Sequence, residues 1–241
     1  MKILIIRHGD PDYVLDSLTE KGKREAALLA DRMKGEKIDV IYTSPLGRAR
    51  LTARYTANVI GKEPIIKDWL QEFSHRVDLP YLDKPHLIWD LLPEFWSKDD
   101  RLYDREKWRE VDFMKKGDIA AYYREVCDGF DALLAEHGYV REGRIYRAER
   151  PNRETIALFC HFGVESVLLS HILSVAPTVL GHGLVALPTS VTTIYTEERR
   201  KGVASLRVAA FGDLSHLFAG GEEPSFSARF CETFDSDERH D

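Results

Sequence analysis

The sequence predicts an α/β protein, a three-layer α/β/α sandwich with a mostly parallel sheet and an inserted helical cap. Two apolar runs, Ile3–Ile6 and Thr155–Cys160, indicate fully buried strands, because neither run offers a solvent-facing side. Helical patterns follow both runs, and an alternation of strands and helices implies a sheet covered on both faces. With 241 residues, the chain can form one such domain.

A first helix is expected soon after the first strand. The segment Ser17–Glu20 has the spacing of a capping box, with Ser17 as the expected N-cap. The residues beyond it repeat at intervals of three and four and form one apolar helical face: Ala26, Leu29, Ala30 and Met33.

A second strand–helix pair follows. Val40–Tyr42 indicates a short buried strand, and Ser44 and Pro45 are typical of an N-cap and a first helical position. We expect this helix to run through Arg48 to about Val59, and Ile65–Ile66 to form a third strand.

Residues from about 73 to 116 interrupt the alternation. The stretch is rich in charge and proline, and the four tryptophans fall in it or just before it: Trp69, Trp89, Trp96 and Trp108. Disordered linkers are poor in aromatic residues. We therefore expect an inserted cap of short helices within a single domain that spans 1–241.

The second half of the chain returns to the alternation. A helix is expected over 118–136, a hairpin turn at Glu142-Gly143, and a strand over Thr155–Cys160 that ends at His161. A helix then follows His161, and Val191–Thr196 and Ala204–Ala210 indicate two last strands.

Composition excludes several classes of function. Charged residues make up 31% of the chain, the net charge is −6 and the pI is about 5.9, so a polyphosphate backbone would be repelled and nucleic acid is not expected. No apolar run approaches the roughly 18 residues of a membrane span. The three cysteines, Cys127, Cys160 and Cys231, are too few for a disulfide framework and fit a reducing cytoplasm.

Polar residues at the ends of the two long strands carry the chemistry. Arg7 and His8 follow the first strand and His161 follows the second, and ligands of open α/β sheets bind at that edge. Arg48 and a helix amino terminus after His161 would add positive charge for a phosphate. Arginines beside a histidine lower its pKa, and a neutral imidazole can attack a phosphoryl group.

These residues resemble the histidine phosphatase superfamily, the phosphoglycerate mutase-like group of branch 1. The matching segments occur in the family's order along nearly the whole chain: Arg7-His8-Gly9, Leu18–Gly22, Ser44–Ala49 with Thr52-Ala53, Cys160–Gly163 and Asp213–Leu217. The resemblance implies a phosphatase that hydrolyses a small phosphorylated metabolite through a phosphohistidine, with no metal or other cofactor.

The resemblance also implies the roles of individual residues. His8 would be the nucleophile, His161 a second catalytic histidine in the phosphate pocket, and Glu72 the proton donor to the leaving group. To donate, Glu72 must have a raised pKa.

Arg7, Arg48 and Gly9 would bind the substrate. Phosphate contacts from arginine are always charged and often bidentate, which is why these two arginines are expected in the pocket.

The chain also departs from the family's pattern. Asp10-Pro11-Asp12 stands where mutases and many phosphatases have glutamate and a nearby asparagine, and Phe73–Arg76 replaces a glycine- and tryptophan-containing motif. The extra basic groups that a mutase needs for its bisphosphorylated intermediate are not found, which favours a phosphatase. A phosphoglycerate mutase and a non-catalytic module that binds a phosphorylated partner stay open, as does a homodimer.

Several of these residues also have plainer interpretations. Glu72 is about as compatible with an exposed surface position as with the role of proton donor, and His75 and Arg76 fit a solvated loop. Among the other histidines, His171 fits the helical core, His182 a loop and His216 a structural contact near the C-terminus. A zinc enzyme is disfavoured because ligand spacing is missing.

Overall fold

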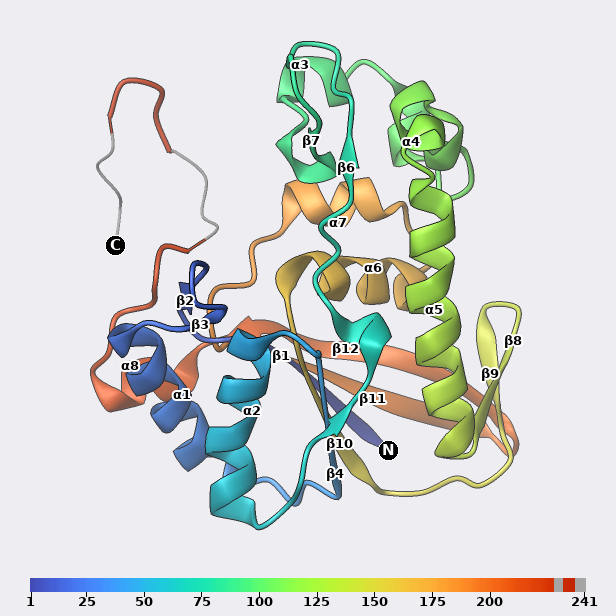
Figure 1. The fold of residues 1–241 in the computed structure, drawn as a ribbon. Helices are drawn as coiled ribbons and strands as arrows, with labels where there is room; N and C mark the ends of the chain where they lie inside the picture. Colours follow the sequence, from blue (N-terminus) through green and yellow to red (C-terminus); the bar gives the residue numbers. More distant parts are fainter. Residues whose placement is uncertain (228–231, 237–241) are drawn as a thin grey trace.

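The structure, a computed structural model, describes residues 1–227 and 232–236 and contains one large sheet (Figure 1). Its strand order is β5-β4-β10-β1-β11-β12-β9-β8. The bounds of these strands are β1 (Lys2–Arg7), β4 (Val40–Thr43), β5 (Ile65–Ile66), β8 (Tyr139–Glu142), β9 (Ile145–Ala148), β10 (Thr155–Cys160), β11 (Val191–Arg200) and β12 (Val203–Asp213).

The sheet has a parallel half and an antiparallel half. β1, β10, β4 and β5 are parallel neighbours, whereas β11 joins the other edge of β1 in antiparallel pairing and is followed by β12 and the hairpin β9–β8. The parallel half contains both strands that were predicted to end in histidine. The predicted α/β fold is confirmed.

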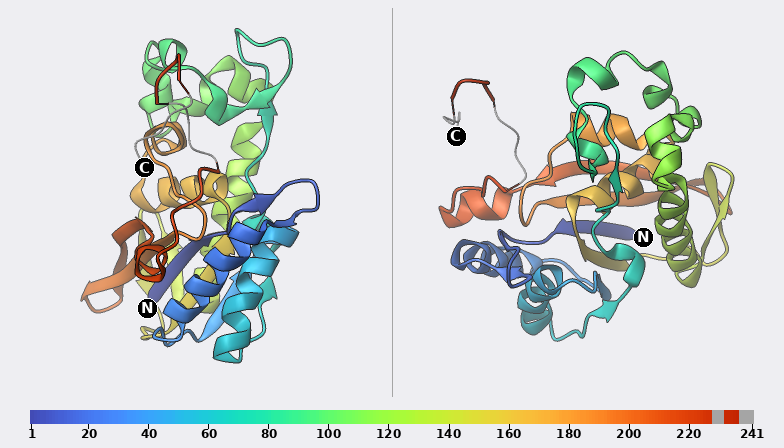
Figure 2. Two further views of the ribbon diagram at one scale, coloured as in Figure 1. Left: turned by 90° about the vertical axis from the view of Figure 1, so that its left-hand side faces the viewer. Right: turned by 45° about the horizontal axis from the view of Figure 1, so that its top comes forward.

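Helices cover both faces of the sheet, which gives three layers (Figures 1 and 2). Ile3 and Ile5 of β1 join one buried cluster, and Leu4 and Ile6 join the other, because successive side chains of a strand point to opposite faces. The cluster around Ile3 takes in α5 (Ile119–Glu136) and α6 (Phe162–Leu173). The cluster around Leu4 takes in α1 (Glu20–Met33) and α2 (Gly47–Ile60), and α8 (Ser215–Gly220) packs on α1.

Residues 73–116 stand above α6 and α7 (Pro177–Gly183) at the top of Figure 1. This cap segment consists of short elements: β6 (Arg76–Val77), β7 (His86–Leu87), the 3₁₀ helices η2 (Ile88–Asp90), η3 (Asp100–Tyr103) and η4 (Lys107–Glu110), α3 (Pro93–Trp96) and α4 (Asp112–Lys116). Trp69 lies outside it, in the 3₁₀ helix η1 (Asp68–Leu70), and packs on Phe130 of α5.

Three local predictions are wrong. The N-cap of α1 is Thr19, whose hydroxyl accepts from Gly22 N, while Ser17 lies in the small hairpin β2 (Pro11–Asp12) and β3 (Ser17–Leu18). The helix expected at Ser44 begins only at Gly47, and the Ser44 hydroxyl, which accepts from Leu46 N, also lies against His161. His182 lies in α7 rather than in a loop.

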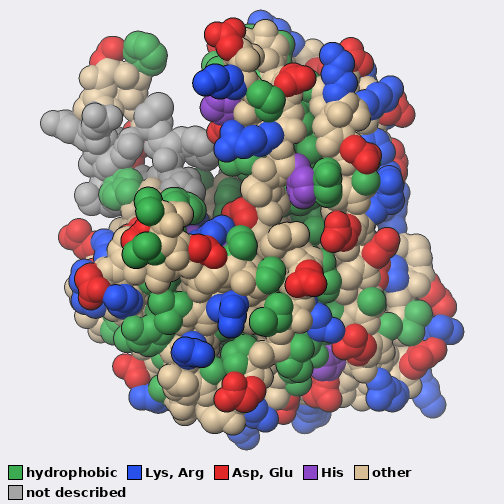
Figure 3. All heavy atoms as spheres, in the orientation of Figure 1, with side chains coloured by type: hydrophobic (Ala, Val, Ile, Leu, Met, Phe, Trp, Pro, Cys, Tyr) green, Lys and Arg blue, Asp and Glu red, His purple; other side chains and the backbone are tan. Residues whose placement is uncertain are grey.

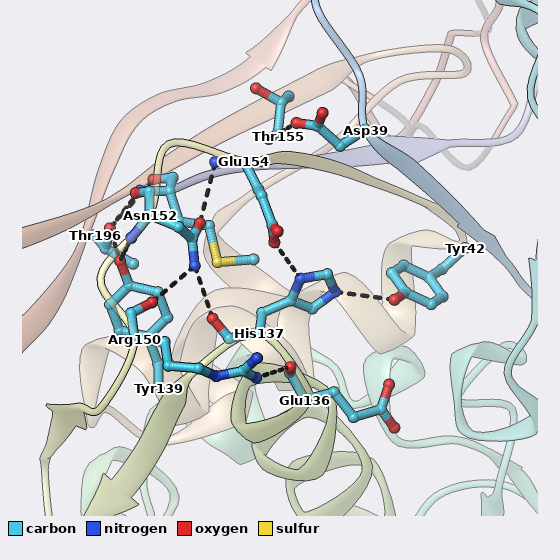
Figure 4. Close-up of polar contacts among 11 residues, drawn as sticks. Asp39, Tyr42, Glu136, His137, Tyr139, Arg150, Asn152, Glu154, Thr155 and Thr196 are labelled. Carbon is cyan, nitrogen blue, oxygen red and sulfur yellow. Dashed lines mark hydrogen bonds and ion pairs between the residues drawn. The ribbon is translucent and has the colours of Figure 1, made fainter.

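The end of the sheet opposite the two histidines is held by a polar network (Figure 4). His137, just after α5, lies between the Glu154 carboxylate at 2.6 Å and the Tyr42 hydroxyl at 2.9 Å. Asn152 donates to the His137 carbonyl at 2.8 Å. These contacts fix the start of β10 against the end of α5.

Acidic and basic side chains are interspersed on the face shown in Figure 3. In the described part of the chain, no helix is long and apolar enough to span a membrane. Cys127 and Cys160 are buried and free, and Cys231 lies outside the described residues.

Candidate active site

The ends of two neighbouring strands bring the two histidines together. β1 and β10 run parallel with Arg7 opposite Cys160, so the residues that follow them, His8 and His161, emerge side by side. Their ring centroids are 5.0 Å apart, and both side chains are buried.

The His8 ring is oriented by its own loop. Nδ1 donates to the Gly9 carbonyl at 2.7 Å, because a carbonyl can only accept, and this leaves the lone pair on Nε2. Arg48 Nε donates to that Nε2 at 3.3 Å. Burial, followed by the charges of Arg7 and Arg48, holds the pKa of His8 well below its usual range. The imidazole is therefore neutral at neutral pH and can act as a nucleophile.

Gly9 serves the orientation of His8. Its amide N–H, the group it could offer to a substrate, donates to Thr52 Oγ1 at 3.0 Å. A side chain at Gly9 would lie 2.7 Å from the Gly22 carbonyl oxygen, so only glycine permits the close approach of this loop to α1.

Arg48 is held at the amino terminus of α2 by a carboxylate. Asp16 accepts from Arg48 Nη1 at 2.6 Å through Oδ1 and from Gly47 N at 2.6 Å through Oδ2. These contacts lower the pKa of Asp16. Asp16 thus caps α2 in place of the predicted Ser44 and sets the direction in which the guanidinium points.

Arg7 is buried at the end of β1. Its Nη1 donates to the Ala186 carbonyl at 2.6 Å and to the Ser227 carbonyl at 3.2 Å. The charge therefore sits beside His8 in a region of low dielectric, where an anion is attracted strongly.

Glu72 and His161 flank the amino terminus of α6. Glu72 Oε1 accepts from Phe73 N at 2.8 Å and from Val164 N at 3.3 Å, and a side chain at Gly163 would lie 2.6 Å from it. Desolvation raises the pKa of Glu72, although the charges of Arg7 and Arg48 oppose this rise. The side chain as a whole is half-buried.

His161 is held from the other side of the pocket. Its Nε2 lies 2.8 Å from Ser44 Oγ, and burial together with the charges of the pocket holds its pKa well below the usual range.

The structure brings the six predicted site residues to one edge of the sheet. Sequence reasoning missed the part played by Asp16 and Ser44, which reach the site from distant segments. It also missed Glu165, which is fully buried in α6 with a pKa raised to about 7 by desolvation. His75 and Arg76 do not join the pocket, because His75 stacks on Tyr122 and Arg76 donates to the Pro85 carbonyl.

Comparison with known proteins places this chain in a family. The sequence profile of the histidine phosphatase superfamily (branch 1) matches residues 3–115. A probable phosphoglycerate mutase of Cronobacter sakazakii is 30% identical over 157 residues, which span 57% of this chain and 70% of that protein. The chain belongs to the histidine phosphatase superfamily, branch 1.

Other curated relatives match this histidine phosphatase family member over a smaller share of their length. Phosphoserine phosphatase 1 of Hydrogenobacter thermophilus is 28% identical over 57% of this chain and 66% of its own length. A probable phosphoglycerate mutase of Photorhabdus laumondii is 33% identical over 46% of this chain, and the match spans 48% of that protein. The chain thus spans between about half and seven tenths of these relatives.

Solved structures share the fold of this superfamily member. A mutant phosphoserine phosphatase from Entamoeba histolytica in complex with phosphoserine has a TM-score of 0.60 at 21% identity, over 90% of this chain and 98% of that one. A mycobacterial glucosyl-3-phosphoglycerate phosphatase in complex with VO3 has a TM-score of 0.53 at 19% identity, over 87% and 98%.

Proposed function

We propose that this protein hydrolyses a phosphate monoester through a phosphohistidine on His8, without a metal ion. The observation that carries the proposal is the state of His8. Its proton is fixed on Nδ1 by the Gly9 carbonyl, its pKa is depressed, and its unprotonated Nε2 accepts from Arg48 Nε. A neutral nucleophile beside two fixed cations suits attack on a phosphoryl group.

The reaction has two steps. His8 Nε2 attacks phosphorus, the ester P–O bond breaks, and Glu72 gives its proton to the leaving oxygen as the alcohol departs. Water then attacks the phosphohistidine and passes its proton to the Glu72 carboxylate, and cleavage of the N–P bond restores His8. Arg7, Arg48 and His161 stabilise the charge on the transferring oxygens in both steps.

The test is hydrolysis of an aryl phosphate with a chelator present, by the wild type and by His8→Ala. We expect chelator-resistant turnover in the wild type and its loss in the variant, because the nucleophile is gone. A rapid alkaline quench followed by intact mass measurement should detect the added phosphoryl group on the wild type alone. A fully active His8→Ala protein would refute the proposal.

The names of two relatives favour a second candidate, a phosphoglycerate mutase. Conversion of 3- to 2-phosphoglycerate, assayed with and without a bisphosphoglycerate primer, separates it from the phosphatase. Primer-dependent conversion that outpaces phosphate release would identify the mutase.

A further inference from the structure

The surroundings of Glu72 define where the alcohol part of a substrate lies, provided that the proposed function holds. A proton donor must reach the ester oxygen within hydrogen-bond distance. Whatever groups flank the Glu72 carboxyl therefore also contact the atoms next to the ester bond.

Trp89, a residue of η2 in the cap segment, is one of these groups. A side chain built at Gly163 would lie 2.6 Å from Glu72 Oε1 and 3.2 Å from Trp89 Nε1. Both atoms thus flank the same crowded point at the start of α6, where only glycine lets them approach the helix so closely. Trp89 connects the cap segment directly to the proton donor.

The indole ring is held firmly in this position. A side chain at Gly181 of α7 would collide with its six-membered ring, so α7 packs directly against this part of the indole. On another side, the ring centroid of Phe73 is 6.2 Å away. These contacts fix the direction of the Nε1–H bond.

This N–H bond is available to a ligand. An indole nitrogen can only donate, and among residues 1–227 and 232–236 Trp89 makes ring contacts but no hydrogen bond. The side chain is half-buried. An acceptor atom on the alcohol part of a substrate would pair with it.

The charges around the Glu72 carboxyl restrict which alcohol groups the substrate can have. The cations that act on the Glu72 carboxyl are Arg7 and Arg48, and the proposed mechanism assigns both to the phosphoryl group. The other contacts of the carboxyl within residues 1–227 and 232–236 are the backbone N–H groups of Phe73 and Val164, near Gly163 and the Trp89 indole, and the buried Glu165 adds a negative charge nearby. A second anionic group on the substrate would find no counter-charge among these neighbours.

We propose that Trp89 determines substrate specificity by donating its indole N–H to an acceptor oxygen of the alcohol part. The substrates are phosphate monoesters whose alcohol is uncharged and carries an oxygen close to the ester bond. A carboxylate or a second phosphate at that place is disfavoured.

Three phosphate esters with a three-carbon chain test this proposal on the full-length protein. Propyl phosphate lacks a further acceptor, glycerol 3-phosphate has neutral oxygens, and 3-phosphoglycerate has a carboxylate. For the wild type we expect kcat/KM to be highest with glycerol 3-phosphate and lowest with 3-phosphoglycerate. A wild type that prefers 3-phosphoglycerate overturns the specificity proposal and leaves the phosphatase proposal intact.

Trp89→Phe keeps an aromatic ring but removes the donor. We expect the preference for glycerol 3-phosphate over propyl phosphate to fall about tenfold, which corresponds to one hydrogen bond of roughly 1.4 kcal/mol. Trp96→Phe is the matched control. Trp96 stacks on His182, which Trp89 also contacts edge-on, but Trp96 is not among the atoms nearest Gly163, so its preference should not change. An unchanged preference in Trp89→Phe overturns the role of Trp89. Absence of any hydrolysis by the wild type refutes the phosphatase proposal and this one together.

Discussion

At the scale of single residues, the chemistry of the candidate site depends on the protonation of His8 and Glu72. The Gly9 carbonyl assigns the His8 proton to Nδ1, and burial works in opposite directions on the two key groups, lowering the pKa of His8 and raising that of Glu72. Burial thus favours the neutral form of both groups, an imidazole with a single proton and a carboxyl that retains its proton more readily. The proposed two-step phosphoryl transfer uses such a pair, a neutral nucleophile and a proton donor.

If Glu72 donates the proton, the effect of replacing Glu72 on the hydrolysis rate should depend on how strongly the leaving group needs a proton. Glu72→Gln should slow hydrolysis of an alkyl phosphate by about 10²–10⁴-fold, the usual contribution of a general acid or base. With p-nitrophenyl phosphate the leaving phenolate needs no proton, so the variant should release a first burst of nitrophenolate before a slow steady state. Stopped-flow absorbance measures this burst.

The slow steady state after the burst also results from the loss of Glu72, because in the proposed mechanism Glu72 activates the water that hydrolyses the phosphohistidine. Asp68→Asn, an exposed carboxyl of η1 just before Glu72, is the control and should behave like the wild type. If Glu72→Gln slows the first turnover of both esters equally, Glu72 is not the proton donor.

At the scale of elements, strands were easier to predict from the sequence than helix ends. β10 occurs at the expected bounds, because a run of apolar residues has few alternatives to burial. The start of α2 was misplaced, because Ser44 and Pro45 satisfy a local capping pattern while the real capping partner, Asp16, is more than thirty residues away. Such a contact depends on tertiary structure and leaves no local trace in the sequence.

The same contact makes Asp16 a positioning residue for Arg48. Asp16→Asn keeps an acceptor for Gly47 N and tolerates the left-handed backbone at this position, where φ is 46°, but it removes the charge that fixes the guanidinium. We expect KM to rise about 5–10-fold, in line with the loss of a charge-assisted hydrogen bond, while kcat changes little. A less firmly held guanidinium would bind the phosphoryl group more weakly in the ground state and in the transition state alike, which raises KM and leaves kcat nearly unchanged.

Steady-state kinetics on the full-length protein measure this split. Asp12→Asn, in the same hairpin, is the matched control, because the Asp12 carboxylate accepts only from the backbone of its own turn at Val14 and Leu15. An unchanged KM in Asp16→Asn, or an equal rise in the control, would rule out the positioning role.

At the scale of the whole molecule, the sequence predicted the layers but not the complete sheet. Apolar runs and helical periodicity located the parallel half and α5, since burial on both faces fixes those patterns. The pairing of β11 with β1 and of β12 with β9 joins segments far apart in the chain, and composition alone does not encode it. The sequence also did not indicate that Glu165 is buried, because this depends on the packing of α6, a helix that is buried on nearly all sides.

Glu165 makes the stability of the whole fold depend on pH. Its pKa is raised by burial from 4.5 to about 7, so the folded protein holds a proton that the unfolded chain has lost. Below the unfolded pKa the carboxyl is protonated in both states and adds no pH-dependent penalty. As pH rises, the penalty of burying its charge grows, and it levels off above about pH 7, where the carboxyl is charged in both states. The full penalty is on the order of 3 kcal/mol.

Glu165→Gln removes this titration while keeping the shape of the side chain. We expect its melting temperature to match the wild type near pH 4.5 and to exceed it by roughly 6–12 °C above pH 8, given about 2–4 °C per kcal/mol for a chain of this size. Glu25, whose pKa is also raised to about 7, titrates in both proteins and cancels in the difference. Glu63→Gln, at an exposed position, should show no such gap. If the difference in melting temperature between Glu165→Gln and the wild type stays constant across this pH range, the titration of Glu165 does not affect stability. Any fall in stability with pH would then come from another buried group.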